Sequence, residues 1–199
     1  MMTRLATLFA LLLAFLPVAH AATPVGPEVA VMQIRVGREK QTQQVVIGLY
    51  DSVAPQTVEN FKELCRRKFY NGMRFHRVFP NTLVQTGDPR SRWGQADKSG
   101  TGGPGYTVPP EIKLNNVRGS VAMARLPDKI NPSKLSNGSQ FFASLTALPK
   151  IDGQYTVFGE ILEGLDVLDY ISNLPTDTND FPIAKVVIKS ITIQPRFAQ

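Results

Sequence analysis

Three long hydrogen-bonding side chains stand among apolar and aromatic residues in short, strand-like runs of this chain. Arg77 lies in the run RFHRV, Gln85 in VQTGD and Gln140 in NGSQFF. A shallow apolar pocket obtains its specificity from a few aimed donors of this kind. The pattern predicts a binding surface, and a reaction on it would have a guanidinium and two amides to work with.

The other reactive residue types are too few to build a nucleophile or a metal site. After residue 21, His76 is the single histidine and Cys65 the single cysteine, so zinc clusters and Cys–His pairs lack members. A serine triad would need His76, but the chain has no GxSxG motif. We interpret His76 as structural and Cys65 as a buried small side chain. We therefore expect no metal and no cofactor, and a reaction in which bonds rotate or protons move little.

The first residues have the pattern of a secretory signal. An apolar run from Leu5 to Leu16 follows Arg4, and this run is too short to span a bilayer as a helix. Pro17 ends the run, and the sequence AHA at 19–21 predicts cleavage before residue 22. We expect residues 1–21 to be a cleavable signal peptide and the mature chain not to insert stably into a membrane. An uncleaved anchor is the alternative.

A short signal with one basic residue favours a bacterial origin, so we expect an exported protein, in the periplasm ahead of secretion into the medium. The remaining length fits one domain: a loose lead-in at 22–28, the domain at 29–195 and a tail at 196–199. The formal net charge is +6, but no basic stripe with interleaved aromatic residues is present, so we expect no nucleic-acid partner. We expect a monomer.

Alternating and apolar runs predict eight strands, separated by Gly, Pro and Asn clusters. The helical spacing of apolar residues predicts one helix at 55–69, capped by Ser52 or Thr57, and a second at 165–171. Strands without βαβ alternation favour a closed antiparallel barrel, which removes exposed edges, with the helices covering its ends. The expected strands are 29–36, 43–50, 73–78, 83–86, 119–124, 140–145, 156–160 and 184–194.

The stretch 88–110 is rich in glycine and contains GTGGPG at 100–105. It matches neither the dinucleotide-binding nor the P-loop pattern, so we interpret it as a turn-rich surface loop. Trp93 within it has two interpretations, folded toward the groove or packed on the surface.

Six motifs resemble those of cyclophilin-type peptidyl-prolyl cis-trans isomerases, and they occur in the same order as in that family. The motifs are FHRV at 75–78, QTGD at 85–88, GTGG at 100–103, VAMA at 121–124, NGSQFF at 137–142 and VFG at 157–159. They cover nearly all of residues 29–194. The resemblance implies an eight-stranded barrel with two helices, cofactor-free isomerisation of X-Pro bonds, and proline-containing polypeptides as partners. Together with the signal pattern, it predicts an isomerase that assists protein folding outside the cytoplasm.

The same resemblance assigns roles to residues. It implies that Arg77 is catalytic and that Phe142 and Leu83 form walls of the proline pocket. Gln85 and Gln140 would place hydrogen bonds. The remaining implied substrate-binding residues are Ala124 and Arg125, which would hold the peptide by their backbone, Ile151 and Tyr155 at the rim, and Thr82 and Leu126.

Several positions depart from the family pattern. Thr82 stands where an aromatic residue is common, Lys150 where the best-known eukaryotic members have tryptophan, and Tyr155 where they have histidine; Arg125 and Leu126 replace the usual asparagine and alanine. A cation in place of the rim tryptophan argues against cyclosporin binding. Thr82 would thin the proline pocket, which motivates an alternative function, a non-catalytic peptide-binding module or holdase. An unrelated secreted barrel that binds a small molecule is a third hypothesis.

Overall fold

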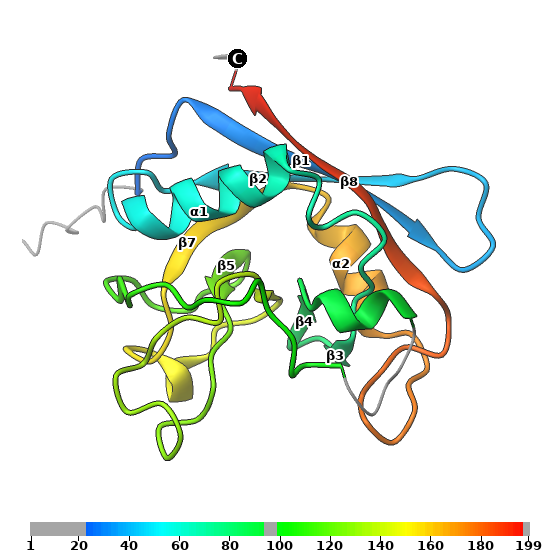
Figure 1. Ribbon diagram of the computed structural model, residues 1–199. Coiled ribbons are helices and arrows are strands. Elements are labelled where there is room, and N and C mark those ends of the chain that lie inside the picture. The colour runs from blue at the N-terminus through cyan, green and yellow to red at the C-terminus, as the bar shows by residue number, and fades with distance from the viewer. Residues whose placement is uncertain (1–22, 94–98, 197–199) are drawn as a thin grey trace, which may run out of the picture.

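The computed structural model describes residues 23–93 and 99–196, and the expected signal peptide lies outside them. The described chain forms one eight-stranded antiparallel sheet and two α-helices (Figure 1). The predicted numbers of strands and helices are thereby confirmed, although some boundaries differ. The strands are β1 (Glu28–Val36), β2 (Gln43–Leu49), β3 (Arg77–Phe79), β4 (Leu83–Thr86), β5 (Ser120–Met123), β6 (Phe141–Ser144), β7 (Val157–Glu163) and β8 (Val186–Pro195).

The sheet curves round its core as a half-barrel, in the strand order β3-β4-β6-β5-β7-β2-β1-β8. Its end strands, β3 and β8, share no ladder. Instead the segment just before β3 reaches β8 through one bridge, between Arg74 and Val187, and through short backbone hydrogen bonds such as Gly72 N to Ile188 O at 2.8 Å. The predicted closed barrel is therefore met only in part, because the strand expected at 73–78 does not begin until Arg77.

The two helices pack against the main hydrophobic core of the sheet. α1 (Pro55–Arg66) buries Val58, Phe61, Leu64 and Cys65 on one face, the face that its spacing predicted. The Phe61 ring contacts three other buried rings, with centroid distances of 5.2–5.5 Å to Tyr70, Phe141 and Phe158. α2 (Leu165–Ser172) packs against β2, β3 and β4. The core thus joins α1 to β6 and β7, and β6 carries one wall of the groove described below.

The cap of α1 was predicted wrongly. The N-cap residue is Ala54, without a side-chain cap bond, and neither Ser52 nor Thr57 takes that role. The carboxylate of Glu111 instead accepts hydrogen bonds from the backbone N–H groups of Gln56, at 3.2 Å, and Thr57, at 2.9 Å. An anion at a helix N-terminus satisfies unpaired donors and complements the helix dipole. Because Glu111 is distant in sequence, no local pattern indicated it.

The chain on either side of the sheet is also held by backbone bonds. In the lead-in, Gly26 N donates to Leu49 O at 2.7 Å, and after β8 Arg196 N donates to Pro27 O at 2.7 Å. α1 ends at Arg66, earlier than expected, where the chain turns through Lys68 with φ +56°. None of the helices within the described ranges has the length and apolar character that crossing a membrane requires.

Candidate active site

A groove of about 740 Å³ lies beside β3, β4 and β6, and ten of the eleven residues assigned to the site from the sequence line it. These ten residues come from widely separated parts of the chain. They are Arg77, Leu83, Gln85, Ala124, Arg125, Leu126, Gln140, Phe142, Ile151 and Tyr155.

Thr82 is the exception. It lies in the turn between β3 and β4, where its hydroxyl donates to the carbonyl of Pro80 at 2.9 Å and its carbonyl accepts from Leu145 N at 2.8 Å. These bonds hold Thr82 in the turn, and it is not part of the groove lining. Lys150 and Trp93 also lie outside that lining, and the Trp93 side chain is 79% exposed. Of the two interpretations of Trp93, the structure has the surface position.

Strand register places the main side chains in one row. Arg77 on β3 is paired with Gln85 on β4, Gln85 with Phe142 on β6, and Phe142 with Ala122 on β5. Directly paired residues of neighbouring antiparallel strands point to the same face with Cβ atoms about 5 Å apart. A guanidinium, an amide and an aromatic ring therefore stand side by side on the face that forms the groove.

A chain of hydrogen bonds fixes the two glutamine side chains. Gln85 Nε2 donates to Gln140 Oε1 at 2.9 Å, and Gln140 Nε2 donates to the carbonyl of Gly102 at 2.7 Å. Gln140 is buried, with 2% exposure, so both ends of its amide are satisfied inside the protein. These bonds restrict both side chains to one orientation.

Asp88 anchors the glycine-rich loop that supplies the Gly102 carbonyl. Its buried carboxylate accepts hydrogen bonds from the backbone N–H groups of Arg90 at 2.7 Å, of Gly102 at 3.1 Å, and of Gly100. A side chain at position 102 would not fit, because its Cβ would lie 2.2 Å from Asp88 Oδ1. The loop interpretation from sequence agrees with the structure of residues 99–110, whereas Pro89–Trp93 forms a short 3-10 helix and residues 94–98 lie outside the described residues. The buried aspartate that organises the loop was not predicted.

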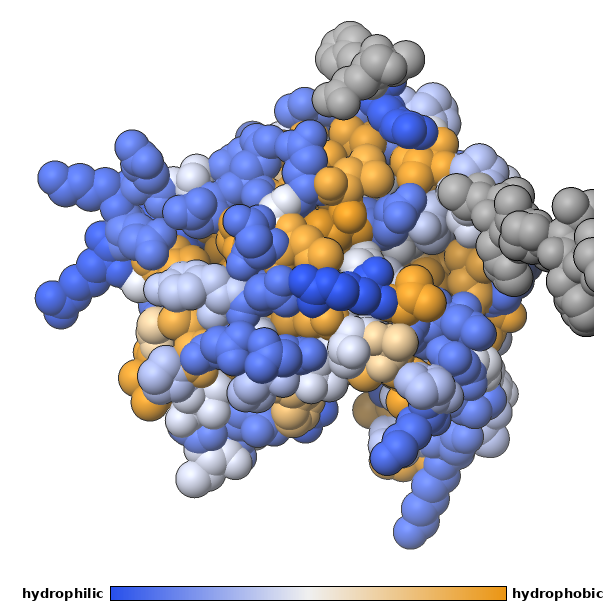
Figure 2. All heavy atoms as spheres, turned by 180° about the vertical axis from the view of Figure 1, so that it is seen from behind, coloured by the Kyte–Doolittle hydropathy of each residue, from blue (hydrophilic) through white to orange (hydrophobic). Residues whose placement is uncertain are grey.

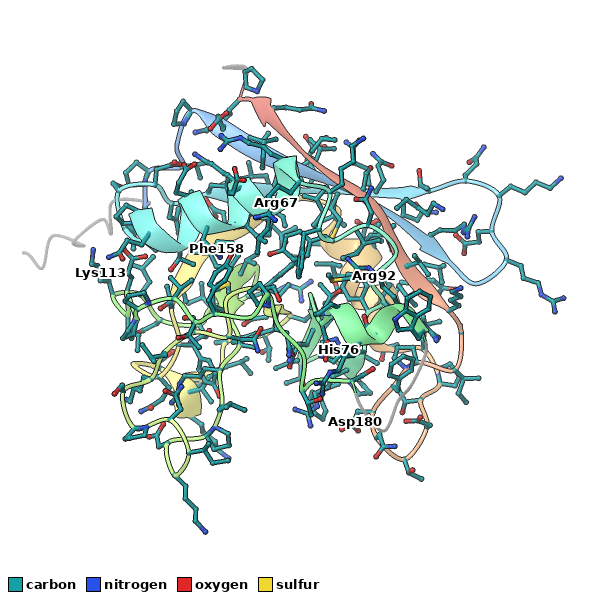
Figure 3. All side chains as sticks on the ribbon, in the orientation of Figure 1. Arg67, His76, Arg92, Lys113, Phe158 and Asp180 are labelled. Carbon is teal, nitrogen blue, oxygen red and sulfur yellow. The ribbon has the colours of Figure 1, made fainter. Side chains whose placement is uncertain are left out.

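His76 lies in the floor of the groove, beside the hairpin formed by β3 and β4 (Figure 3). Burial lowers the pKa of His76 to about 4, although the negative charge of Asp88 opposes this shift. The imidazole is therefore neutral near pH 7. Sequence reasoning gave His76 a structural role and did not place it in the groove.

Arg77 is the exposed cation of the groove. Its guanidinium carbon lies 5.6 Å from the centre of the Phe79 ring, and no carboxylate among the described residues forms an ion pair with it. Asp180 also lines the groove, from the loop before β8 that lies beside β3 (Figure 3). A hydrogen bond from Val78 N to Asp180 O, at 3.0 Å, holds this loop beside β3. The loop residues Thr178, Asn179 and Asp180 were missed from sequence, because long-range contacts such as this bond bring them to the groove.

Phe142 and Tyr155 form the aromatic part of the wall. Their rings meet edge to face, with centroids 5.4 Å apart and an interplanar angle of 89°. Phe142 is 4% exposed and packs with Ala122, Ala124 and Val157, while Leu83 and Ile151 pack against the same cluster. This cluster is separate from the main core and gives the groove an apolar side.

A second hollow, of about 860 Å³, lies over the sheet surface formed by β1, β2 and β7, lined by residues such as Val29, Val46 and Leu162. The molecule seen from behind exposes apolar side chains in patches between polar ones (Figure 2). The hollow is larger than the groove, but it lacks a fixed row of donors, so we place the chemistry in the groove. Within the described ranges no three His, Cys, Asp or Glu side chains come together to hold a metal ion.

Comparison with known proteins shows which family the chain belongs to. A family model described as cyclophilin type peptidyl-prolyl cis-trans isomerase matches residues 31–193. Peptidyl-prolyl cis-trans isomerase D of Saccharomyces cerevisiae is 38% identical over 190 residues, which cover 92% of this chain and 80% of the yeast protein. Human peptidyl-prolyl cis-trans isomerase-like 3 is 39% identical over 157 residues, which cover 78% of this chain and 93% of the human protein.

Solved structures share the fold. A cyclophilin type peptidyl-prolyl cis-trans isomerase of Cryptosporidium parvum superposes with a TM-score of 0.68 at 28% identity, over 83% of this chain and 99% of its own. A second structure of that protein, determined in the presence of the dipeptide Ala-Pro, gives a TM-score of 0.67.

The chain therefore belongs to the cyclophilin-type peptidyl-prolyl cis-trans isomerase family, and the enzyme class predicted from the sequence is confirmed at the level of this family. The relatives named above are eukaryotic, so they do not support the bacterial origin expected from the first residues.

Proposed function

We propose that the groove binds X-Pro segments of polypeptides and that Arg77 catalyses their cis-trans rotation. The observation that carries this proposal is the row of Arg77, Gln85 and Phe142 across β3, β4 and β6. Phe142 offers an apolar surface for a proline ring, while Arg77 presents donors from two strands away across β4. The Ala-Pro dipeptide used with the Cryptosporidium parvum protein supports a substrate of this kind.

The chemistry requires no covalent intermediate. Rotation about a peptide bond crosses a barrier of about 18–20 kcal/mol because the amide must lose its resonance, and for X-Pro bonds it takes tens to hundreds of seconds unaided. As the bond twists, the proline nitrogen becomes pyramidal and its lone pair can accept a hydrogen bond. Arg77 is suited to donate that bond, because a guanidinium stays charged and carries a planar fork of donors.

Arg77 alone would not supply the whole rate enhancement. A charge-assisted hydrogen bond contributes about 1.5–3 kcal/mol, whereas a millionfold acceleration requires about 8 kcal/mol. The remainder must come from binding the twisted peptide better than the planar one. Gln85, held by Gln140, offers a fixed amide for the substrate backbone.

Further contacts would come from the end of β5. Ala124 N donates to Gln140 O at 2.9 Å, and Ala124 O accepts from Asn137 N at 2.8 Å. The backbone of Ala124 therefore already has partners within the protein. We assign the hydrogen bond to the bound peptide at this end of the groove to the backbone of Arg125. Leu83, Leu126, Ile151 and Tyr155 complete the apolar walls.

The test is the cis-to-trans isomerisation of a proline tetrapeptide by purified wild type beside Arg77→Ala. An enhancement that collapses in a folded Arg77→Ala variant supports both the reaction and its catalytic residue. A variant as fast as wild type overturns the role of Arg77. A folded wild type that binds the peptide without accelerating its isomerisation would favour the alternative, a peptide-binding module or holdase. That alternative was motivated by a proline pocket thinned at Thr82, but Thr82 lies outside the groove lining.

For the location we propose export, to the periplasm of a bacterial cell or else into the medium, with assistance to protein folding there. Support comes only from the apolar run and the AHA sequence at 19–21. The N-terminus of protein isolated from an exporting host tests this directly. A start at residue 22 supports the proposal, and a start at Met1 or Met2 in the cytoplasmic fraction overturns it.

We also propose that the mature chain acts as a monomer without stable membrane insertion. Its proposed partners are unfolded or folding polypeptides that contain proline. Sedimentation of the purified protein at micromolar concentration tests the oligomeric state, and a dimer mass would contradict it.

A further inference from the structure

Arg125 follows β5 and lines the groove, yet its side chain is only 6% exposed. A guanidinium so well buried requires partners for its donors and its charge. The family resemblance involved only the backbone at this position. The surroundings of the side chain therefore pose a separate question.

Every nitrogen of the Arg125 guanidinium has a partner. Nε donates to Gln154 O at 2.7 Å, Nη2 to Gln154 Oε1 at 3.2 Å and Nη1 to Leu126 O at 2.9 Å. Nη1 also forms an ion pair with Asp128 Oδ1 at 2.5 Å. Because the fork is planar, these contacts fix both its position and its orientation. Its charge is thus already paired, which argues against a role in binding an acidic substrate.

The fixed guanidinium lies over the ring of Tyr155, with its central carbon 5.1 Å from the ring centre. Tyr155 in turn meets Phe142 edge to face at 5.4 Å. The Tyr155 ring therefore contacts both a buried aromatic ring, which belongs to the sheet, and a guanidinium, which belongs to the loop after β5. Cation–π contact of this kind favours one face-on arrangement.

We propose that Arg125 is a positioning residue, whose guanidinium holds Tyr155 against Phe142 and so sets the width of the proline pocket. This inference rests on the proposed function, in which Phe142 and Tyr155 form the walls that receive the proline ring. Without Arg125 the Tyr155 ring would lose one of these two contacts and could turn into the groove. The competing explanation is that Arg125 only stabilises the loop at 125–128, through its contacts with Leu126 and Asp128.

A double-mutant cycle separates the two explanations. Kinetics with a proline tetrapeptide are measured for wild type, Arg125→Met, Tyr155→Ala and the double variant. We expect Arg125→Met to raise KM about fivefold with little change in kcat, and to have less than about a twofold effect when Tyr155 is already alanine, since residues in contact are energetically coupled. Equal effects of Arg125→Met in both backgrounds, or a wild-type KM in Arg125→Met, would overturn the proposal.

Two further variants sharpen the cycle. Arg125→Lys keeps the positive charge beside Asp128 but not the planar fork, so we expect it to resemble Arg125→Met; full rescue by lysine would show that only the ion pair matters and would contradict the proposal. Arg38→Met is the matched control, because Arg38 is exposed in the turn between β1 and β2. We expect wild-type kinetics from it.

The wild type also provides a readout that needs no turnover. The proposal requires nuclear Overhauser contacts between the Arg125 side chain and the Tyr155 ring, and their absence would overturn it even if the Arg125 variants failed to fold. The affinity for the dipeptide Ala-Pro can replace KM throughout the cycle. If the wild type binds the dipeptide but shows no isomerase activity, the proposed reaction fails while the role of Arg125 is still tested.

Discussion

Two buried polar networks hold different parts of this sheet, and they differ in what they leave available to a ligand. On α1, Lys62 is 5% exposed and lies between the carboxylates of Glu28, at 3.0 Å, and Asp51. At the groove, Asp88 and Gln140 bind backbone groups of the glycine-rich loop. The Lys62 network pairs its cation inside the protein, whereas the groove network leaves Arg77 without a carboxylate partner among the described residues.

This difference indicates how the fold separates stability from activity. The opposite charges round Lys62 join the first strand, β1, to the chain before α1 and to α1 itself. The bonds at the groove fix amides and a loop, and the nearby cation remains exposed. We therefore expect changes at Lys62 to affect unfolding and changes at Arg77 to affect turnover.

The largest expected effect is at Arg77. Removing a charge-assisted bond of about 3 kcal/mol from the transition state corresponds to a decrease in kcat/KM of about 100-fold, so we expect that decrease in Arg77→Ala with an unchanged melting temperature. Arg66→Ala is the matched control, because Arg66 is a half-exposed arginine on α1 that pairs with Glu59. Equal kcat/KM values for the two variants would remove the distinction between the networks.

Lys62→Met should have the reverse effect. Breaking a buried ion pair on one side costs about 3–5 kcal/mol, and partial exposure of Glu28 and Asp51 places this case at the lower end. We expect the free energy of unfolding in urea to decrease by about 3 kcal/mol, with kcat/KM within twofold of wild type below the transition. A loss of turnover in the folded variant would show that the two networks are coupled.

The groove network should also respond to pH through His76. Its folded pKa, about 4, lies below the unfolded value, about 6.5. The unfolded chain therefore binds more protons in this range, and the contribution of His76 to stability, complete above pH 6.5, is lost as the pH falls toward 4. We expect the free energy of unfolding to decrease by about 2 kcal/mol more between pH 7 and pH 5 in wild type than in His76→Gln. Parallel curves for the two proteins would contradict the neutral, buried state.

The smallest effect concerns the cap of α1. Glu111→Gln keeps an acceptor near Gln56 N and Thr57 N but removes the negative charge at the helix terminus. We expect a decrease of about 1 kcal/mol in the free energy of unfolding, measured by urea denaturation, with unchanged kcat/KM. Glu59→Gln, which alters an exposed acid on the same helix, should have less than half this effect. A larger effect from Glu59 would show that Glu111 does not act as a cap.

Much of the fold followed from local patterns. The alternation in β1 and β2 and the spacing of Val58, Phe61 and Leu64 in α1 reflect which side of each element is buried, and a single strand or helix determines that pattern. The sequence predicted the ends of strands and helices less well where contacts with another part of the chain determine them. β3 begins at Arg77 because the residues before it bond to β8.

The sequence predicted those residues of the candidate site that are recognisable by their residue type and local surroundings. Arg77, Gln85 and Gln140 were recognisable because long polar side chains are unusual in apolar strand runs. Thr82 was assigned to the groove because it stands where family members commonly have an aromatic residue, but the bonds of the β3–β4 turn hold it outside. The roles of His76, Asp88 and the loop at 178–180 depend on contacts that no short run of sequence contains.

The sequence by itself therefore determined which segments are strands and helices, and which side chains could supply donors to a bound peptide. Only the tertiary structure decided that Arg77, Gln85 and Phe142 share one row, that Glu111 caps α1, and that the side chain of Arg125 lies on Tyr155. The physical reason is the range of the interactions. Burial patterns repeat every two to four residues, whereas these contacts join residues far apart in the chain and depend on the register and curvature of the whole sheet.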